Sequence, residues 1–250
     1  MRYYLLLLLI VIRLTCCVAQ QDTTRRTGNF CGTSQRALRN NIIALSIPVA
    51  LITYGSLCTN NNGFPSSHDV KKFRDNHFST FKNYTDDYLL YSNAALVYGF
   101  DLLKIPAKND VLNQSIIMAK TTVLALGIAG IMKYSFTQTR PDRSDNLSFP
   151  SGHSALAFAL AGVLHHEFKD SSPWISVLGY TSATVTGAMR ILNNRHWYSD
   201  VLVGAGIGML STNIVYLTHR NKYSNSSLKR SVCLPIIGTN YYGLSWQKSF

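Results

Sequence analysis

The stretch FPSGHSA, residues 149–155, decides how the rest of the sequence is interpreted, because it places a histidine where an apolar run begins. Ser151 is a candidate N-cap, and Pro150 keeps the chain extended just before it. Gly152 lets the backbone approach a ligand closely. A helix N-terminus has unpaired N–H groups and a partial positive charge, so it suits an anion. We therefore predict a helix that begins at this stretch and binds an anion at its start.

Two cations precede this stretch. The segment KYSFTQTRPD (133–142) places Lys133 seven residues before Arg140. Seven residues are about two helical turns, so both cations can lie on one helix face and reach one point. Pro141 cannot continue a helix, so we expect the Arg140 guanidinium to lie at a helix end.

The segment RILNNRHWYSD (190–200) follows downstream and supplies Arg190, His196 and Asp200. His196 and Asp200 are four residues apart, a spacing that lets a carboxylate touch an imidazole across one helical turn. A carboxylate sets the tautomer of its histidine and stabilises the imidazolium, which makes the histidine a better nucleophile or base. A second histidine, His153, can protonate a leaving oxygen. No zinc-type spacing occurs, and the acids are too few and scattered for magnesium, so we expect metal-free phosphoryl transfer without a cofactor.

These three segments, in this order, resemble the signature of the phosphatidic acid phosphatase type 2 / haloperoxidase superfamily. That signature is Lys-x6-Arg-Pro, then Pro-Ser-Gly-His, then Ser-Arg-x5-His-x3-Asp, and the resemblance covers about residues 85–218. The resemblance implies that His196 attacks phosphorus, that Asp200 orients it, and that His153 protonates the leaving group and then activates water. The phosphoryl oxygens would be held by Lys133, Arg140, Arg190, Ser151 and Gly152.

Two features of the sequence depart from this signature. Met189 stands where the family usually has serine, which removes a hydroxyl near Arg190. Only eight residues (142–149) separate the first two segments, which leaves little room for a lid. We therefore expect an open pocket.

Outward from the motifs, six apolar segments predict helices, at 41–57, 87–104, 111–134, 153–168, 173–192 and 200–218. The expected fold is an all-α bundle of about six helices, with the active site at converging helix ends. Each segment is near the ~20 residues that a bilayer requires, but several are short or interrupted. Short membrane spans and buried helices of a soluble bundle both fit. The glycine runs at 127–130 and 204–208 predict close helix packing. Residues 58–86 are expected to form a polar connection.

The two ends of the chain differ from this helical part. Residues 1–19 predict a signal peptide or an N-terminal anchor, and residues 20–40 a flexible basic lead-in. The helical phosphatase domain is expected over 41–220, and a polar linker with a β-like tail over 221–250, with a hairpin at 231–250. Export implies an oxidising compartment, where Cys31, Cys58 and Cys233 allow at most one disulfide.

Composition narrows the substrate class. The net charge is +12, and 46% of residues are hydrophobic. A basic surface suits nucleic acid, anionic lipid headgroups or phosphorylated substrates, but no basic–aromatic stripe favours nucleic acid. The leading hypothesis is a membrane-associated envelope phosphatase with an outward, periplasm-facing site, acting on lipid A, polyprenyl diphosphate or phosphatidate-type lipids. The alternatives are a soluble exported acid phosphatase of broad specificity and, less favoured, a vanadium haloperoxidase, since those are typically much longer.

Overall fold

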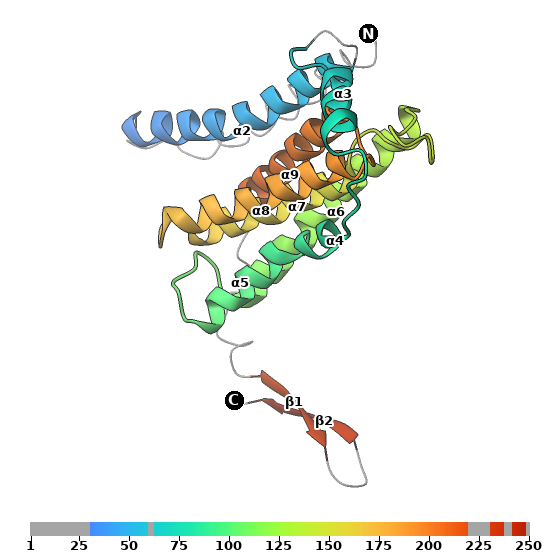
Figure 1. The fold of residues 1–250 in the computed structure, drawn as a ribbon. Coiled ribbons are helices and arrows are strands. Elements are labelled where there is room, and N and C mark those ends of the chain that lie inside the picture. The colour runs from blue at the N-terminus through green and yellow to red at the C-terminus, as the bar shows by residue number, and fades with distance from the viewer. Residues whose placement is uncertain (1–30, 60–62, 220–230, 238–241, 249–250) are drawn as a thin grey trace.

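The computed structural model of the chain describes residues 31–59, 63–219, 231–237 and 242–248, with side chains described for 44–59 and 63–219. Its helical part confirms the expected all-α class (Figure 1). The described residues form eight helices rather than about six: α2 (Cys31–Thr59), α3 (Ser67–His77), α4 (Thr85–Leu89), α5 (Ser92–Leu102), α6 (Val111–Ser135), α7 (Gly152–Phe168), α8 (Pro173–Leu192) and α9 (Tyr198–Thr218).

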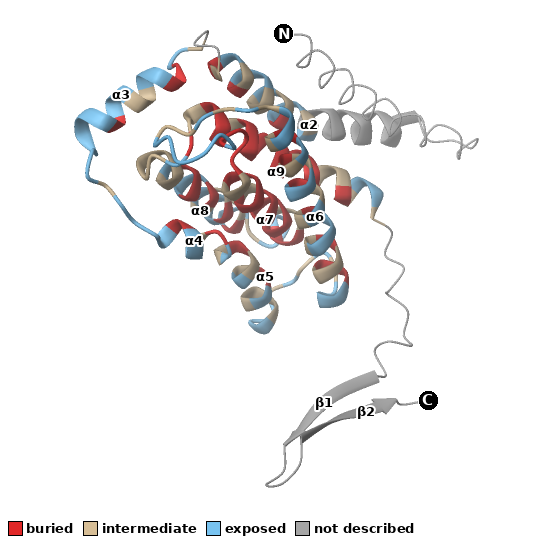
Figure 2. Ribbon diagram, turned by 90° about the vertical axis from the view of Figure 1, so that its right-hand side faces the viewer, coloured by how far each residue is buried: buried red, intermediate tan, exposed pale blue. Residues whose placement is uncertain are grey.

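Helix α7 is the central helix of the bundle. It packs against α6, α8 and α9, and α9 in turn packs against α2. Figure 2 shows α7 and α9 as the most continuously buried helices, with exposed residues concentrated on the peripheral ones. The apolar run that follows FPSGHSA therefore forms the core, because every neighbouring helix contributes side chains to it.

The start of α7 confirms that a helix begins at FPSGHSA, and anion binding there stays a prediction. Ser151 is the N-cap, and its Oγ accepts a hydrogen bond of 3.3 Å from the backbone N–H of Ser154. A Cβ added at Gly204 on α9 would lie 2.5 Å from the Ser151 carbonyl oxygen, and one at Gly208 would collide with the Ala155 carbonyl oxygen. Glycine at these positions allows the close approach of α9 that holds the start of α7 in place.

The prediction of close helix packing is wrong for the glycine run at 127–130. A Cβ at Gly127 or Gly130 on α6 would meet no atom of the described residues within 4 Å. These glycines face outward, so their small size is not required by packing inside the bundle. The difference from the run at 204–208 lies in which helix face the glycines occupy.

The polar connection at 58–86 is also more ordered than predicted. Helix α3 begins with a capping box, in which Ser66 and Asp69 satisfy each other's backbone N–H groups. The segment 87–104 is not one helix, because α4 ends at Leu89 and α5 begins at Ser92. Helix α2 begins at Cys31, inside the segment expected as a lead-in. The proposed domain boundaries stay predictions.

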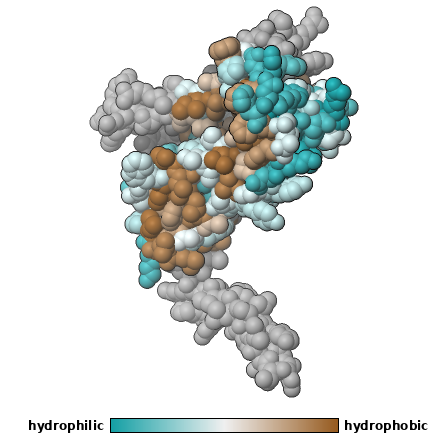
Figure 3. Space-filling model, in the orientation of Figure 1, coloured by the Kyte–Doolittle hydropathy of each residue, from teal (hydrophilic) through white to brown (hydrophobic). Residues whose placement is uncertain are grey.

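Two described helices, α6 and α9, are long and apolar enough to cross a membrane. In the most apolar 18-residue stretch of each helix, 28% of the stretch in α6 is buried inside the structure, against 61% of the stretch in α9. Helix α6 exposes Val123 (72%) and Ile131 (71%). Figure 3 shows hydrophilic side chains gathered at the end of the bundle near α3, and apolar ones over the part farther from it.

In the tail, β1 (Ser231–Ile237) and β2 (Tyr242–Lys248) pair antiparallel, with Ser231 opposite Lys248. The side chains of both strands lie outside the described residues, so the hairpin stays a prediction beyond this backbone pairing. The predicted signal peptide or anchor also lies outside them. Of the cysteines considered, Cys58 is a free, buried thiol, and the side chains of Cys31 and Cys233 are not described.

Candidate active site

The candidate site lies where the ends of four antiparallel helices meet. These ends are the C-termini of α6 and α8 and the N-termini of α7 and α9. The backbone N–H of Ser151 donates to the Asp200 carbonyl oxygen at 3.0 Å, which joins α7 to α9. Lys133 Nζ donates to the Leu147 carbonyl oxygen at 2.7 Å, which joins α6 to the segment that leads into α7. The folding of the bundle thus brings the three sequence motifs to one end.

His196 and Asp200 form a buried pair at the start of α9. His196 is 3% exposed and Asp200 is fully buried. His196 Nδ1 lies 3.4 Å from Asp200 Oδ2. The same oxygen accepts hydrogen bonds from the backbone N–H of Trp197 at 2.9 Å and from the Ser148 hydroxyl. The carboxylate is therefore fixed by two further donors, and Ser148 is a residue that the sequence analysis did not single out.

Burial controls the charge of His196. Removal from water lowers the pKa of His196 from 6.5 to about 4, the neighbouring Asp200 opposes this shift, and the charges of Lys133 and Arg140 lower the pKa further. The imidazole is neutral at pH 7. Its contact with Asp200 favours the tautomer that carries the proton on Nδ1, which leaves the Nε2 lone pair free.

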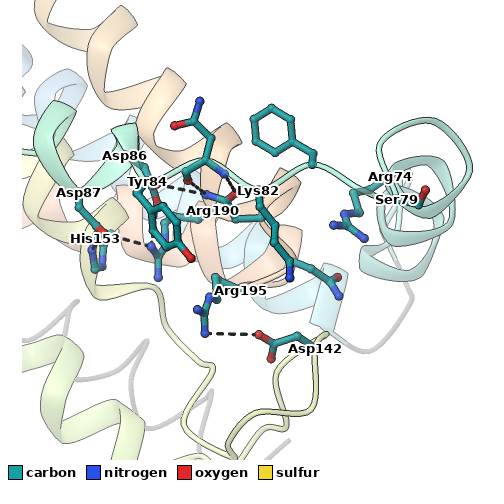
Figure 4. A pocket seen from close by; sticks show the side chains of 14 residues that line it. Arg74, Ser79, Lys82, Tyr84, Asp86, Asp87, Asp142, His153, Arg190 and Arg195 are labelled. Atoms are coloured by element: carbon teal, nitrogen blue, oxygen red, sulfur yellow. Dashed lines mark hydrogen bonds and ion pairs between the residues drawn. The ribbon is translucent and has the colours of Figure 1, made fainter.

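Two aspartates of α4 contact the predicted site residues Arg190 and His153. Arg190 Nη1 donates to Asp86 Oδ2 at 2.7 Å and lies 3.6 Å from Asp87 Oδ1. His153 Nε2 lies 2.9 Å from Asp87 Oδ1 (Figure 4). Burial, then the charge of Arg190, lowers the pKa of His153, while Asp87 opposes the shift. The sequence analysis missed both aspartates; their signal was the acidic pair at positions 86 and 87, just before an apolar segment.

The expected placement of Arg140 is wrong. Helix α6 ends at Ser135, so Arg140 lies in the following loop and not two turns along the helix from Lys133. Arg140 Nε pairs with Asp145 Oδ1 at 2.8 Å, and this contact lowers the pKa of the Asp145 carboxyl. The loop nevertheless folds back toward the site, since Arg140 Nη1 lies 3.4 Å from the Arg195 carbonyl oxygen.

The two small residues at the start of α7, Ser151 and Gly152, have different roles. The Ser151 side chain is fully buried and accepts from the Ser154 backbone and hydroxyl, so it serves the helix cap. Gly152 faces open space, because a Cβ there would meet nothing within 4 Å. Of these two residues, Gly152 is the one that leaves room for a ligand.

In the described part of the chain, three of the predicted site residues line one of two neighbouring cavities. A cavity of about 500 Å³ is lined by His153 and Arg190, while His196 lines a much smaller hollow of about 10 Å³. Both are lined by Arg74 and Asn194, so they adjoin each other. The remaining predicted residues line neither cavity: Lys133, Arg140, Ser151, Gly152 and Asp200. Among the described residues, no group of three or more His, Cys, Asp or Glu could hold a metal ion.

Comparison with known proteins finds one curated protein and two solved structures to which this chain is similar. Over 90 residues the chain is 52% identical to the lipid A 1-phosphatase of Porphyromonas gingivalis, an alignment that covers 36% of this chain and 20% of that protein. The chain thus spans about a fifth of the length of this curated relative. Among solved structures, Aquifex aeolicus LpxE is similar with a TM-score of 0.45 at 23% identity, over 58% of this chain and 93% of that one. The first transmembrane PAP2-type phosphatidylglycerolphosphate phosphatase from Bacillus subtilis is similar with a TM-score of 0.44 at 17% identity, over 68% and 94%.

The family match covers the three sequence motifs of the candidate site, but not Asp86 and Asp87 of α4. Residues 114–224 match the PAP2 superfamily, and this range contains all three sequence motifs from Lys133 to Asp200. The part of the chain that carries the helix ends, the buried histidine–aspartate pair and the neighbouring cations is thus similar to the PAP2 superfamily.

Proposed function

We propose that the chain is a metal-independent phosphatase that removes phosphate from a phosphorylated lipid through a phosphohistidine. One observation carries this proposal: the buried His196, whose Nδ1 lies 3.4 Å from the fixed carboxylate of Asp200. A histidine held in this way has one nitrogen available as a nucleophile and a carboxylate to stabilise the cation that forms on attack.

The reaction follows in two balanced steps. In the first, His196 Nε2 forms a bond to phosphorus, the bond from phosphorus to the leaving oxygen breaks, and His153 donates its proton to that oxygen. In the second, His153 takes a proton from water, the oxygen of that water attacks phosphorus, and the P–N bond breaks to return the lone pair to His196. His153 must be protonated for the first step, and the negative charge of a bound phosphate raises its pKa toward that state.

The cations around the site have a separate role. Arg190 lines the same cavity as His153, and Lys133 and Arg140 lie close enough to His196 to lower its pKa. Preorganised positive charge of this kind stabilises the charge that develops on phosphoryl oxygens in the transition state. The ion pairs of Arg190 with Asp86 and of Arg140 with Asp145 keep both guanidinium groups oriented before the substrate arrives.

Two observations support a lipid substrate. The outward face of α6 is apolar, and the curated relative is named for its action on lipid A. A membrane-associated enzyme would hold the acyl chains in the bilayer and present the phosphate to the polar end of the bundle. We place the protein in the cell envelope, with its site facing outward.

The test compares His196→Ala with His77→Ala, a control variant that removes an exposed histidine on α3. Phosphate release from a long-chain phosphorylated lipid and from a short water-soluble phosphomonoester is measured in detergent at matched concentrations. We expect His196→Ala to abolish release, the control variant to retain it, and the wild type to prefer the lipid. Full activity in a folded His196→Ala variant would refute the mechanism. Better hydrolysis of the soluble ester, by protein that washes free of membranes, would instead assign an exported acid phosphatase.

A further inference from the structure

Asp86 and Asp87 lie in the first turn of the short helix α4, and only Asp86 has a role in the function proposed above. Acidic side chains in the first turn of a helix are stabilised by the helix dipole, which would account for both residues without any part in the site. Both side chains, however, contact residues of other helices, Asp86 on α8 and Asp87 on α7. These contacts require a further explanation.

Asp86 is the aspartate that orients Arg190. Its Oδ2 accepts from Arg190 Nη1 at 2.7 Å, its Oδ1 accepts from Asn193 Nδ2 at 3.2 Å, and its side chain is 1% exposed. Asp87 Oδ1 lies 3.6 Å from the same guanidinium nitrogen, beyond hydrogen-bonding distance. Arg190 is therefore held by Asp86, and its orientation does not depend on Asp87.

Asp87 makes its short contact with His153 instead (Figure 4). Asp87 Oδ1 lies 2.9 Å from His153 Nε2, across 66 positions of the sequence. Within the described residues, no hydrogen bond involves His153 Nδ1. A carboxylate on one ring nitrogen fixes the ring and its tautomer, and it leaves the other nitrogen for proton transfer. The contact of Asp200 with His196 Nδ1 has the same form, with the two nitrogens exchanged.

The charges around His153 agree with this interpretation. The charged groups that act on it most strongly come from α4 and α8: Asp86, Asp87 and Arg190. The other charged residues that line the same cavity are Arg74, Lys82, Asp142 and Arg195. Burial lowers the pKa of His153 most, the charge of Arg190 lowers it further, and the hydrogen bond and charge of Asp87 raise it. Without Asp87, the imidazolium would lose its proton at a lower pH.

We infer that Asp87 is a positioning residue for His153, which it holds through Nε2 so that the proton for the leaving oxygen comes from Nδ1. This inference rests on the proposed function. In the first step, the Nδ1–H bond breaks and its proton joins the leaving oxygen as the bond from that oxygen to phosphorus breaks. In the second step, Nδ1 takes a proton from the attacking water. Nε2 keeps its own proton on the side of Asp87 throughout.

The experiment uses two phosphate monoesters with the same long alkyl chain. In one ester the phosphate is joined to an aliphatic oxygen, which must be protonated as it leaves. In the other it is joined to a nitrophenyl oxygen, which leaves as a stable anion and depends little on a general acid. The full chain in detergent is assayed for kcat/KM on both esters, because this value reports the transition state relative to free enzyme and substrate.

The variants are Asp87→Asn and Asp87→Glu, with Asp142→Asn as the matched control. Asp142 lines the same cavity but pairs with Arg195 and not with His153. We expect Asp87→Asn to lower kcat/KM about three- to tenfold on the aliphatic ester and less than about twofold on the nitrophenyl ester, since water screens a carboxylate whose side chain is 51% exposed. Asp87→Glu keeps the charge and should recover part of the loss. In Asp87→Asn, activity on the aliphatic ester should also fall at a lower pH as pH is raised, because His153 loses its proton earlier.

The ratio of the two kcat/KM values is the readout, because a loss of folded enzyme or a disturbance at Arg190 lowers both values alike. The control should keep the wild-type ratio. Equal losses on both esters in Asp87→Asn, or no loss on the aliphatic ester, would overturn this inference and leave the phosphatase standing. Hydrolysis of neither ester by the wild type would overturn the phosphatase itself.

Discussion

Replacing Asp200 by asparagine tests how the structure activates its nucleophile. Asp200 Oδ2 accepts from Ser148, from the Trp197 backbone and from His196. Asparagine keeps the shape but removes the charge and replaces one acceptor oxygen by a donor. A hydrogen bond to a charged group contributes about 1.5–3 kcal/mol, so kcat should fall about 10- to 150-fold. The loss is smaller than for His196→Ala, because the imidazole remains.

The assay is steady-state phosphate release at pH 7, together with a thermal unfolding curve for each variant. Asp170→Asn, which changes an exposed aspartate beyond the far end of α7, is the control and should keep wild-type kcat. Asp200→Glu, which retains the charge, should recover part of the lost rate if charge is what matters. A folded Asp200→Asn variant with less than a threefold loss of kcat would refute the view that this carboxylate prepares His196.

Three further predictions concern metal, packing and pH. EDTA should leave activity unchanged while orthovanadate inhibits, because vanadate resembles the transition state of phosphoryl transfer; a loss with EDTA that Mg²⁺ restores would contradict this. Gly204→Ala should cost about 1–3 kcal/mol in unfolding experiments because its Cβ would lie 2.5 Å from the Ser151 carbonyl oxygen, whereas Gly127→Ala, with nothing within 4 Å, should not destabilise. The pKa of His196 is depressed from 6.5 to about 4, so the unfolded state binds a proton between these pH values that the folded state does not. The free energy of unfolding should therefore be full above pH 6.5 and fall by about 3 kcal/mol as pH drops toward 4. An unfolding midpoint that stays equally sensitive to acid in His196→Gln would argue against this.

The sequence predicted the features of the site that depend on local interactions. The N-cap at Ser151 needs only the helix that follows it, and it was found where expected. The contact of His196 with Asp200 also spans only four residues, although His196 lies before α9 and not on one of its turns. Short-range geometry of this kind is set by the chain itself.

The features that the sequence did not predict depend on the tertiary fold. Arg190 pairs with Asp86 across 104 residues, and no spacing rule connects α4 to α8. Arg140 reaches the site from a loop, because α6 ends at Ser135 before Pro141 is reached. The cavity beside His153 required α3, α4 and the connection between them, a region whose composition indicated no site.

The covalent intermediate tests the central claim most directly. The wild type is mixed with lipid labelled in its scissile phosphate and quenched within milliseconds in alkali, because the P–N bond of a phosphohistidine hydrolyses in acid. The labelled peptide is then identified by mass spectrometry, with His196→Ala as the matched sample. The account predicts label on His196 in the wild type and none in the variant. Label on another residue, or full turnover by the His196→Ala variant, would contradict it.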